Sequence, residues 1–189
     1  MRIQPCALPG VYEITPTPRS DHRGYFMRTY DRKIWADHGL DRQWVQENES
    51  FSQRKGTIRG LHLQLPPYAE TKLVRVTKGA IFDVFVDLRA DSATFGQWGS
   101  IELTADNRKM VYIPSGFAHG FCTLADDCAV AYKVDNFYTP AYEGGVIWND
   151  GTLGIAWPLE GEPVISSKDS LLPSLQMFTR MHQHRDLKG

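Results

Sequence analysis

The sequence lacks both a large net charge and any long hydrophobic segment. Its 21 Lys and Arg residues against 22 Asp and Glu residues give a formal net charge of −1, so no extended basic field favours nucleic acid. No apolar segment approaches the roughly 18 residues that a membrane helix requires. The first ten residues contain no hydrophobic stretch typical of a signal peptide. We therefore expect a cytoplasmic protein that binds neither nucleic acid nor a membrane.

Cysteines and common catalytic motifs are also scarce. Cys6, Cys122 and Cys128 form an odd set without metal-type spacing, which argues against a disulfide framework or a zinc knuckle. The patterns GxGxxG, GxxxxGKS/T, GxSxG and HExxH are absent. Nicotinamide dehydrogenases, P-loop enzymes and common serine hydrolases are therefore poor candidates. His182 and His184 lie in a polar tail without further ligands, so we expect them on a solvated surface.

Length and composition indicate one globular domain. The 189 residues are 42% hydrophobic and 23% charged, which is ordinary for such a domain. We expect residues 1–189 to form a single domain with an N-terminal arm and a C-terminal helical tail over residues 174–186. Asp31 is placed to cap a helix that continues to His38 and that Gly39 ends.

The middle of the chain has the alternation of short strands. In residues 81–88, Phe82, Val84, Val86 and Leu88 share one face, while Ile81, Asp83, Phe85 and Asp87 share the other. Further strands are expected over residues 100–103, 110–113 and 129–134, with turn residues between them. Many short strands at even spacing predict a sandwich or barrel. We expect an all-β, closed jelly roll with a few short peripheral helices, because closure protects strand edges.

One strand places polar side chains together. Over residues 59–65, alternation predicts Arg59, Leu61, Leu63 and Leu65 on one face and His62 and Gln64 on the other. The second face is either the wall of a polar pocket, with His62 as a base, or a surface with a satisfied histidine.

Two further strands point polar residues toward the expected core. Lys72 has the parity of Val74 and Val76, and Tyr132 has the parity of Val130 and Val134. A buried lysine requires an anionic partner; the alternative is a strand-end lysine that reaches water. The alternative for the tyrosine is a core residue with one hydrogen bond.

Read together, several segments resemble the nucleotide-sugar 3,5-epimerases, the family of dTDP-4-dehydrorhamnose 3,5-epimerase. The segments are IRGLHLQ (58–64), KLVRV (72–76), FDVFVDLR (82–89), IPSGFAHGF (113–121), AYKVDNFY (131–138) and WNDGTLGIAWP (148–158). The similarity runs from Gly10 to Leu172. It implies a cupin-type jelly roll, a homodimer, and catalysis without a metal or cofactor.

The resemblance also implies the reaction. A nucleotide-linked 4-keto-6-deoxy sugar is epimerised at C3 and C5, which both neighbour the C4 carbonyl, so that each proton loss gives an enolate. The chemistry needs a base, an acid on the opposite side and positive charge at the oxyanion. By resemblance, His62 is the base, Tyr132 the acid and Lys72 the cation, while Asp169 orients the histidine.

Binding residues follow by the same resemblance. Arg23, Arg59 and His119 match groups that hold the diphosphate and sugar, and the planar arginine fork suits phosphate oxygens. Tyr138 matches the ring that stacks on the nucleotide base. The remaining matches to substrate-binding positions are Gln46, Asn48, Glu143 and Lys168.

Arg28 departs from the family pattern D-x-R-G-x-F-x-E-x-F, because it stands where the pattern has glutamate. A carboxylate accepts hydrogen bonds, whereas a guanidinium only donates them. Arg28 therefore remains a candidate binding residue, and a GDP- or CDP-linked sugar is an alternative to a dTDP-linked one. The sequence also leaves open a 3-only epimerase, a metal-dependent cupin enzyme, and a non-catalytic cupin that binds sugar nucleotides.

Overall fold

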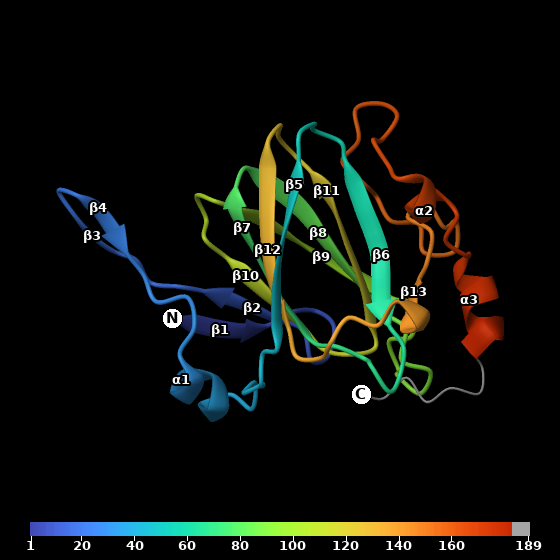
Figure 1. Cartoon of the computed structure of the whole chain (residues 1–189), viewed down its shortest axis with the longest axis horizontal. Coiled ribbons are helices and arrows are strands. Elements are labelled where there is room, and N and C mark those ends of the chain that lie inside the picture. Colours follow the sequence, from blue (N-terminus) through green and yellow to red (C-terminus); the bar gives the residue numbers. More distant parts are fainter. Residues whose placement is uncertain (183–189) are drawn as a thin grey trace.

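The computed structural model describes residues 1–182, and two antiparallel sheets facing each other dominate it (Figure 1). The six-stranded sheet has the order β1-β2-β10-β7-β12-β5 and the five-stranded sheet the order β13-β6-β11-β8-β9. The first sheet consists of β1 (Arg2–Pro5), β2 (Tyr12–Thr15), β10 (Met110–Ile113), β7 (Lys72–Lys78), β12 (Cys128–Val134) and β5 (Gln46–Ser52). The second consists of β13 (Glu143–Gly145), β6 (Ile58–Gln64), β11 (Phe117–Thr123), β8 (Ala80–Asp87) and β9 (Trp98–Thr104).

The main core lies between the sheets, and β8 explains how the second sheet is covered on both faces. Ile81 and Phe85 pack inward with Val74, Val111 and other buried residues of the facing sheet. Val84, Val86 and Leu88 point outward, against a second cluster that includes Leu175 and Phe178 of the C-terminal segment. The predicted division of β8 into two faces is confirmed. Both faces are largely buried, and apart from Asp83 and Asp87 the strand is apolar.

Short helices lie at the periphery, as predicted. Helix α1 (Arg32–Asp37) begins after Asp31, whose side chain accepts from the backbone N–H groups of Lys33 and Ile34. Gly39 follows the end of the helix with φ +70°, a conformation that glycine adopts without strain. Trp35 is fully buried in a third cluster with Tyr112 and Leu40, so this helix is held by packing against the β2–β10 end of the six-stranded sheet.

The C-terminal part contains α2 (Ser167–Ser170) and α3 (Leu175–His182), and a 3₁₀ turn covers Pro140–Tyr142. The predicted tail helix is confirmed over residues 175–182, whereas its extension to residue 186 and His184 lie outside the described residues. The expectation of a solvated His182 is wrong, because its ring is half-buried and lies 4.6 Å, centroid to centroid, from that of Phe178.

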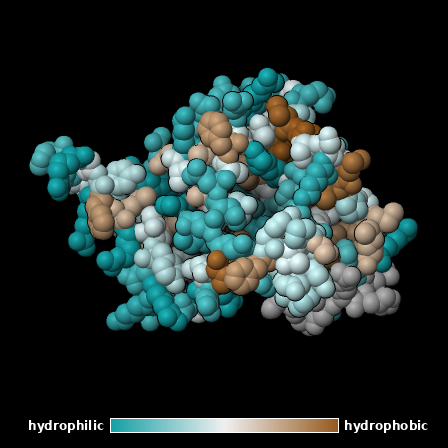
Figure 2. Space-filling model, in the orientation of Figure 1, coloured by the Kyte–Doolittle hydropathy of each residue, from teal (hydrophilic) through white to brown (hydrophobic). Residues whose placement is uncertain are grey.

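A small hairpin of β3 (Arg19–Asp21) and β4 (Gly24–Phe26) projects away from both sheets (Figure 1). The face of the molecule in Figure 2 is mainly hydrophilic, with separate small hydrophobic areas. Within the described residues, no helix is long and apolar enough to cross a membrane.

We expect Phe85→Ala to lower the free energy of unfolding by about 3–5 kcal/mol, because deletion of this ring leaves a cavity between the sheets. Met177 on α3 is half exposed, and Met177→Ala should change the free energy of unfolding by about 0.5 kcal/mol or less. Urea unfolding of both variants measures the difference. Equal midpoints for the two variants would contradict the placement of Phe85 in the core.

Candidate active site

Two adjoining cavities open between the sheets. They have volumes of about 420 Å³ and 300 Å³, and both are lined by His62, Lys72 and Tyr132. His62 comes from β6 of the five-stranded sheet, whereas Lys72 and Tyr132 come from β7 and β12 of the six-stranded sheet. The shared wall therefore presents an imidazole from one sheet and an ammonium and a phenol from the other.

Asp169 fixes the imidazole of His62. The Nε2 atom of His62 lies 2.8 Å from Oδ1 of Asp169, and the backbone N–H of Gly60 donates to Oδ2 at 3.0 Å. Burial raises the pKa of Asp169, but the hydrogen bonds from His62 and Gly60 outweigh burial and hold that pKa below its usual value. The carboxylate is thus ionised at neutral pH. The imidazole ring remains 29% exposed toward the cavities.

A bulge in β6 changes the prediction for Arg59. On β11, His119 pairs with His62 but Phe121 pairs with Arg59, so β6 has one extra residue in this interval. Gly60 has φ +107°, and a Cβ there would lie 2.6 Å from the backbone oxygen of His119. The prediction that Arg59 shares a face with Leu61 is therefore wrong, because the bulge turns Arg59 into the second cavity beside His62.

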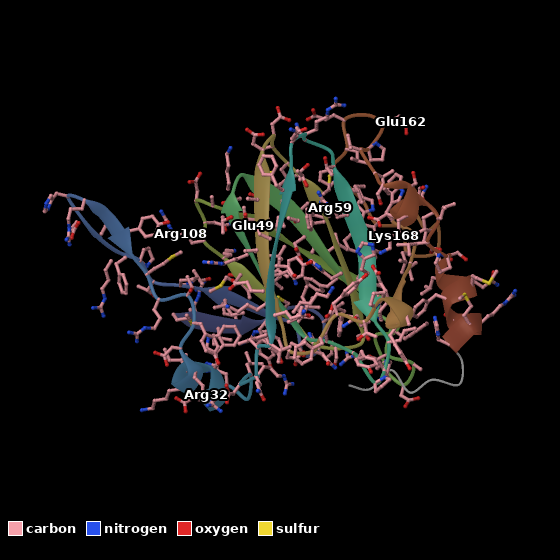
Figure 3. The ribbon with its side chains drawn as sticks, in the orientation of Figure 1. Arg32, Glu49, Arg59, Arg108, Glu162 and Lys168 are labelled. Atoms are coloured by element: carbon pink, nitrogen blue, oxygen red, sulfur yellow. The ribbon has the colours of Figure 1, made fainter. Side chains whose placement is uncertain are left out.

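Arg59 is held at this place by hydrogen bonds to β5. Its Nε donates to Oγ of Ser52 at 3.1 Å, and its guanidinium also donates to the backbone oxygen of Phe51 at 2.9 Å. Arg59 and Lys168, both labelled in Figure 3, lie close to β6 and line the second cavity. His119 lines it as well, so three nitrogen-bearing side chains border this cavity.

The prediction that Lys72 and Tyr132 point inward is confirmed, and the anionic partner of Lys72 is Glu70. The Nζ atom of Lys72 lies 3.1 Å from Oε1 of Glu70, and both side chains are about one-tenth exposed. Sequence reasoning missed Glu70. The signal was present, since a lysine with inward parity requires a buried anion and Glu70 is the nearest acidic residue along the chain.

The phenol of Tyr132 is protonated at neutral pH. Burial raises the pKa of Tyr132 above its ordinary value, and the negative charge of Glu70 raises it further, whereas Arg59 acts in the opposite direction. A phenol with a raised pKa is a proton donor over a wider alkaline range.

His119 also has a carboxylate partner that sequence reasoning missed. Its Nε2 lies 2.8 Å from Oδ2 of Asp83, which is fully buried on β8. Burial raises the pKa of Asp83, while the charges of His119 and Lys72 oppose that rise. The sequence signal was an aspartate between Ile81 and Phe85 on the inward face of the strand.

A chain of polar contacts borders the first cavity. The hydroxyl of Tyr138 donates to Glu143 at 2.8 Å, and Lys168 donates to the same carboxylate at 2.7 Å. Burial raises the pKa of Glu143, but its bonds with Lys168 and Tyr138 hold the pKa below the usual value. Gln46 accepts from the backbone N–H of Tyr138 at 2.7 Å. Asn48 pairs across the strands with Tyr132 and lines the same cavity.

Arg23 and Arg28 lie elsewhere in this chain. Arg23, in the projecting hairpin, has a side chain 78% exposed and pairs with Asp21. Arg28, just beyond the hairpin, is 65% exposed and pairs with Asp31 at 2.9 Å. Neither lines the two cavities around His62. Arg28 instead borders a separate hollow at the base of the hairpin.

Residues 1–182 contain no ligand set of the kind that a metal-dependent cupin enzyme needs. Within this part of the chain, no group of three or more His, Cys, Asp and Glu side chains is arranged to hold a metal ion. His62 and His119 each direct Nε2 to a different aspartate, so the two imidazoles do not converge with a carboxylate on one point.

Comparison with known proteins agrees with this architecture. Residues 5–177 match the family described as dTDP-4-dehydrorhamnose 3,5-epimerase. The chain is 43% identical to the protein of that name from Shigella flexneri, over 89% of this chain and 93% of the relative. It is 47% identical to the one from Methanothermobacter thermautotrophicus, over 86% of this chain and 88% of the relative.

Solved structures give the same result. The crystal structure of the Bacillus anthracis dTDP-4-dehydrorhamnose 3,5-epimerase, described with TDP and pyrophosphate bound, superposes with a TM-score of 0.89. The two chains are 44% identical, and the match covers 92% of this chain and 98% of the other. The predicted family and the predicted all-β, cupin-type jelly roll are both confirmed. The chain belongs to the dTDP-4-dehydrorhamnose 3,5-epimerase family and is an isomerase.

Proposed function

We propose that the protein converts dTDP-4-dehydro-6-deoxy-D-glucose to dTDP-4-dehydro-L-rhamnose by epimerisation at C3 and C5. One observation carries the proposal: His62, with its Asp169 partner, faces Lys72 and Tyr132 across cavities formed by opposite sheets. Inversion at carbon requires a base and an acid on opposite faces of the sugar, and this arrangement supplies both. The TDP described in the similar Bacillus anthracis structure supports the choice of nucleotide.

In the first half of each inversion, His62 removes the proton from C3 or C5. The electrons of the broken C–H bond form a C=C bond, and the C4 carbonyl oxygen becomes an enolate. Asp169 accepts from Nε2 of His62, so it orients the ring and stabilises the imidazolium that forms. The ammonium of Lys72 stabilises the developing oxyanion, because a preorganised charge shielded from water acts more strongly than one in bulk water.

In the second half, Tyr132 returns a proton to the same carbon from the other face. The C=C electrons form the new C–H bond, the C4 carbonyl is restored, and tyrosinate and imidazolium then exchange protons with water. Two such cycles invert both centres. General acid and base steps of this kind typically contribute about 10²–10⁴-fold each.

The proposed binding residues divide between the two cavities. Arg59, His119 and Lys168 line the second cavity and suit the diphosphate, since they offer donors to its oxygens. Tyr138 at the first cavity is half exposed, which leaves its ring free to stack on the base. Gln46, Asn48 and Glu143 complete the polar wall. We also propose the homodimer that the family resemblance implies, in which Arg23 and Arg28 would reach a substrate only on the partner, because they lie outside this chain's own cavities.

Incubation with dTDP-4-keto-6-deoxyglucose in D₂O should introduce two deuterons into the sugar, measured by mass spectrometry, because each enolate is reprotonated from solvent-exchanged groups. One deuteron would indicate a 3-only epimerase instead. Exchange with a GDP- or CDP-linked substrate and none with the dTDP sugar would contradict the nucleotide assignment. No exchange with any of the three would favour the non-catalytic sugar-nucleotide binder.

His62→Ala should reduce deuterium exchange by at least about 10²-fold, since it removes the base, while the Kd for dTDP changes by no more than about threefold. His38→Ala is the matched control, because His38 is exposed at the end of α1 and contacts a backbone oxygen there. Isothermal titration and exchange assays give the two values. Unchanged turnover in His62→Ala would rule out this residue as the base.

The stabilising effect of Asp169 should depend on pH. Its pKa is lower in the folded state than its ordinary value, so its contribution is present above the unfolded pKa of about 3.9. It should be lost as pH falls through the lower, folded-state pKa. We therefore expect the difference in unfolding free energy between wild type and Asp169→Asn to be largest near pH 7 and to shrink below about pH 4.

Urea unfolding from pH 3 to pH 8 measures this difference. Asp37→Asn, at an exposed site on α1, removes the same charge and should show no comparable decrease toward acid pH. A wild-type advantage over Asp169→Asn that is constant with pH would show that the ionised carboxylate is not the stabilising species.

A further inference from the structure

Glu70 carries a carboxylate, about one-tenth exposed, inside the proposed reaction chamber. It lies in the segment between β6 and β7 and lines the first cavity together with His62, Lys72 and Tyr132. Its Oε1 atom is 3.1 Å from Nζ of Lys72. The mechanism above needs the ammonium of Lys72 at the enolate oxygen but assigns no role to Glu70, which directly contacts that ammonium.

The position of Glu70 is itself fixed. Nε2 of Gln64 donates to Oε2 of Glu70 at 3.0 Å and also reaches the backbone oxygen of Tyr68 at 3.0 Å. Oε1 of Gln64 accepts from the backbone N–H of Thr139 at 2.6 Å. A side chain of β6 thus holds the carboxylate, which leaves Glu70 few other positions. Such an anchored partner supplies the geometric precision that an electrostatic catalyst requires.

Lys72 also has a competing partner deeper in the protein. Asp83 on β8 is completely buried, and the ammonium of Lys72 opposes the rise in its pKa that burial causes. Within residues 1–182, its Oδ1 atom has no hydrogen-bond partner, while Oδ2 is taken by His119. Without Glu70, the ammonium would be drawn toward this unsatisfied oxygen, because an unpaired buried charge is costly.

We propose that Glu70 is a positioning residue, whose carboxylate keeps the ammonium of Lys72 in the cavity between His62 and Tyr132 and away from Asp83. The proposal rests on the proposed epimerase function and adds a specific electrostatic support to it. Because the ion pair exists before substrate binds, the ammonium needs no reorganisation when the oxyanion develops.

Glu70 has a second effect, on the acid. The groups that face Tyr132 are Glu70, Glu143 and Tyr138, which raise its pKa, and Arg59, which lowers it; His62 and Lys72 share its cavity walls. Loss of the Glu70 charge therefore lowers the pKa of Tyr132. Since the acid must be protonated to act, the alkaline limb of the rate profile then moves to lower pH.

Glu70→Gln tests the proposal, because it keeps the size of the side chain and removes its charge. We expect kcat for C3 and C5 epimerisation to fall about 10- to 100-fold, as for a displaced catalytic group, with KM changed by no more than about threefold. The alkaline limb of kcat should shift to lower pH. Circular dichroism and the melting temperature establish that the variant is folded.

Glu47→Gln is the matched control. Glu47 lies on β5 outside the two cavities, is part-exposed and forms its own ion pair with Lys133 at 2.8 Å. Its substitution removes the same charge from a carboxylate near β12 and should leave kcat and the alkaline limb unchanged. An equal effect of both substitutions would show that only net charge matters and would overturn the positioning role.

A double-mutant cycle shows whether Glu70 acts through Lys72. In a Lys72→Ala background, Glu70→Gln should reduce the remaining deuterium exchange by less than about twofold, since the group to be positioned is gone. The proposal would be contradicted if Glu70→Gln reduced exchange as much in the Lys72→Ala background as in the wild type. A kcat of the single Glu70→Gln variant above that of the wild type would also contradict it. Deuterium exchange by the wild type is the reference. If the wild type shows no exchange, the epimerase function is rejected. If the wild type exchanges and Glu70→Gln exchanges equally fast, only the positioning role is rejected.

Discussion

The carboxylate of Asp169 is the contact on which the geometry of the site depends. It accepts from His62 and from the backbone of Gly60, residues more than a hundred positions away in the chain. One bond orients the imidazole, and the other holds the bulged backbone of β6 that brings Arg59 into the second cavity. Short helix α2 thus determines both where the imidazole of His62, the proposed base, points and where the guanidinium of Arg59 lies. Hydrogen bonds from two donors also keep the carboxylate ionised despite its burial.

Ionisable side chains inside the jelly roll occur in pairs, each formed by a basic group and a carboxyl group. Lys72 pairs with Glu70, His119 with Asp83, and His62 with Asp169. Buried pairs of this kind stabilise a fold weakly, because desolvation offsets most of their attraction. Their value here is orientation: each cationic or ionisable group is set in place by a carboxylate anchored to a separate strand, loop or helix. A reaction that creates an oxyanion benefits from such fixed charges, since they are aligned before the charge develops.

The cavity walls come from both sheets, and this explains why a jelly roll suits inversion at carbon. The proposed base lies on β6 and the proposed acid on β12, and both line the first cavity. The apolar side chains of the main core, among them Val74, Val130 and Phe85, fill the rest of the interior. They set the distance between the sheets, and this distance also determines how far apart the side chains on the two cavity walls lie.

Local sequence patterns were sufficient for the features that depend on neighbours in the chain. Period-two alternation predicted the two faces of β8 and the inward direction of Lys72 and Tyr132, and Asp31 with Gly39 marked the ends of α1. The same alternation failed at Arg59, because a bulge is set by pairing with β11. The partnership of Asp83 with His119, and the place of the hairpin that carries Arg23, arise only in the folded chain. They depend on which strands become neighbours, and that is decided by long-range packing rather than by the order of residues within any one segment.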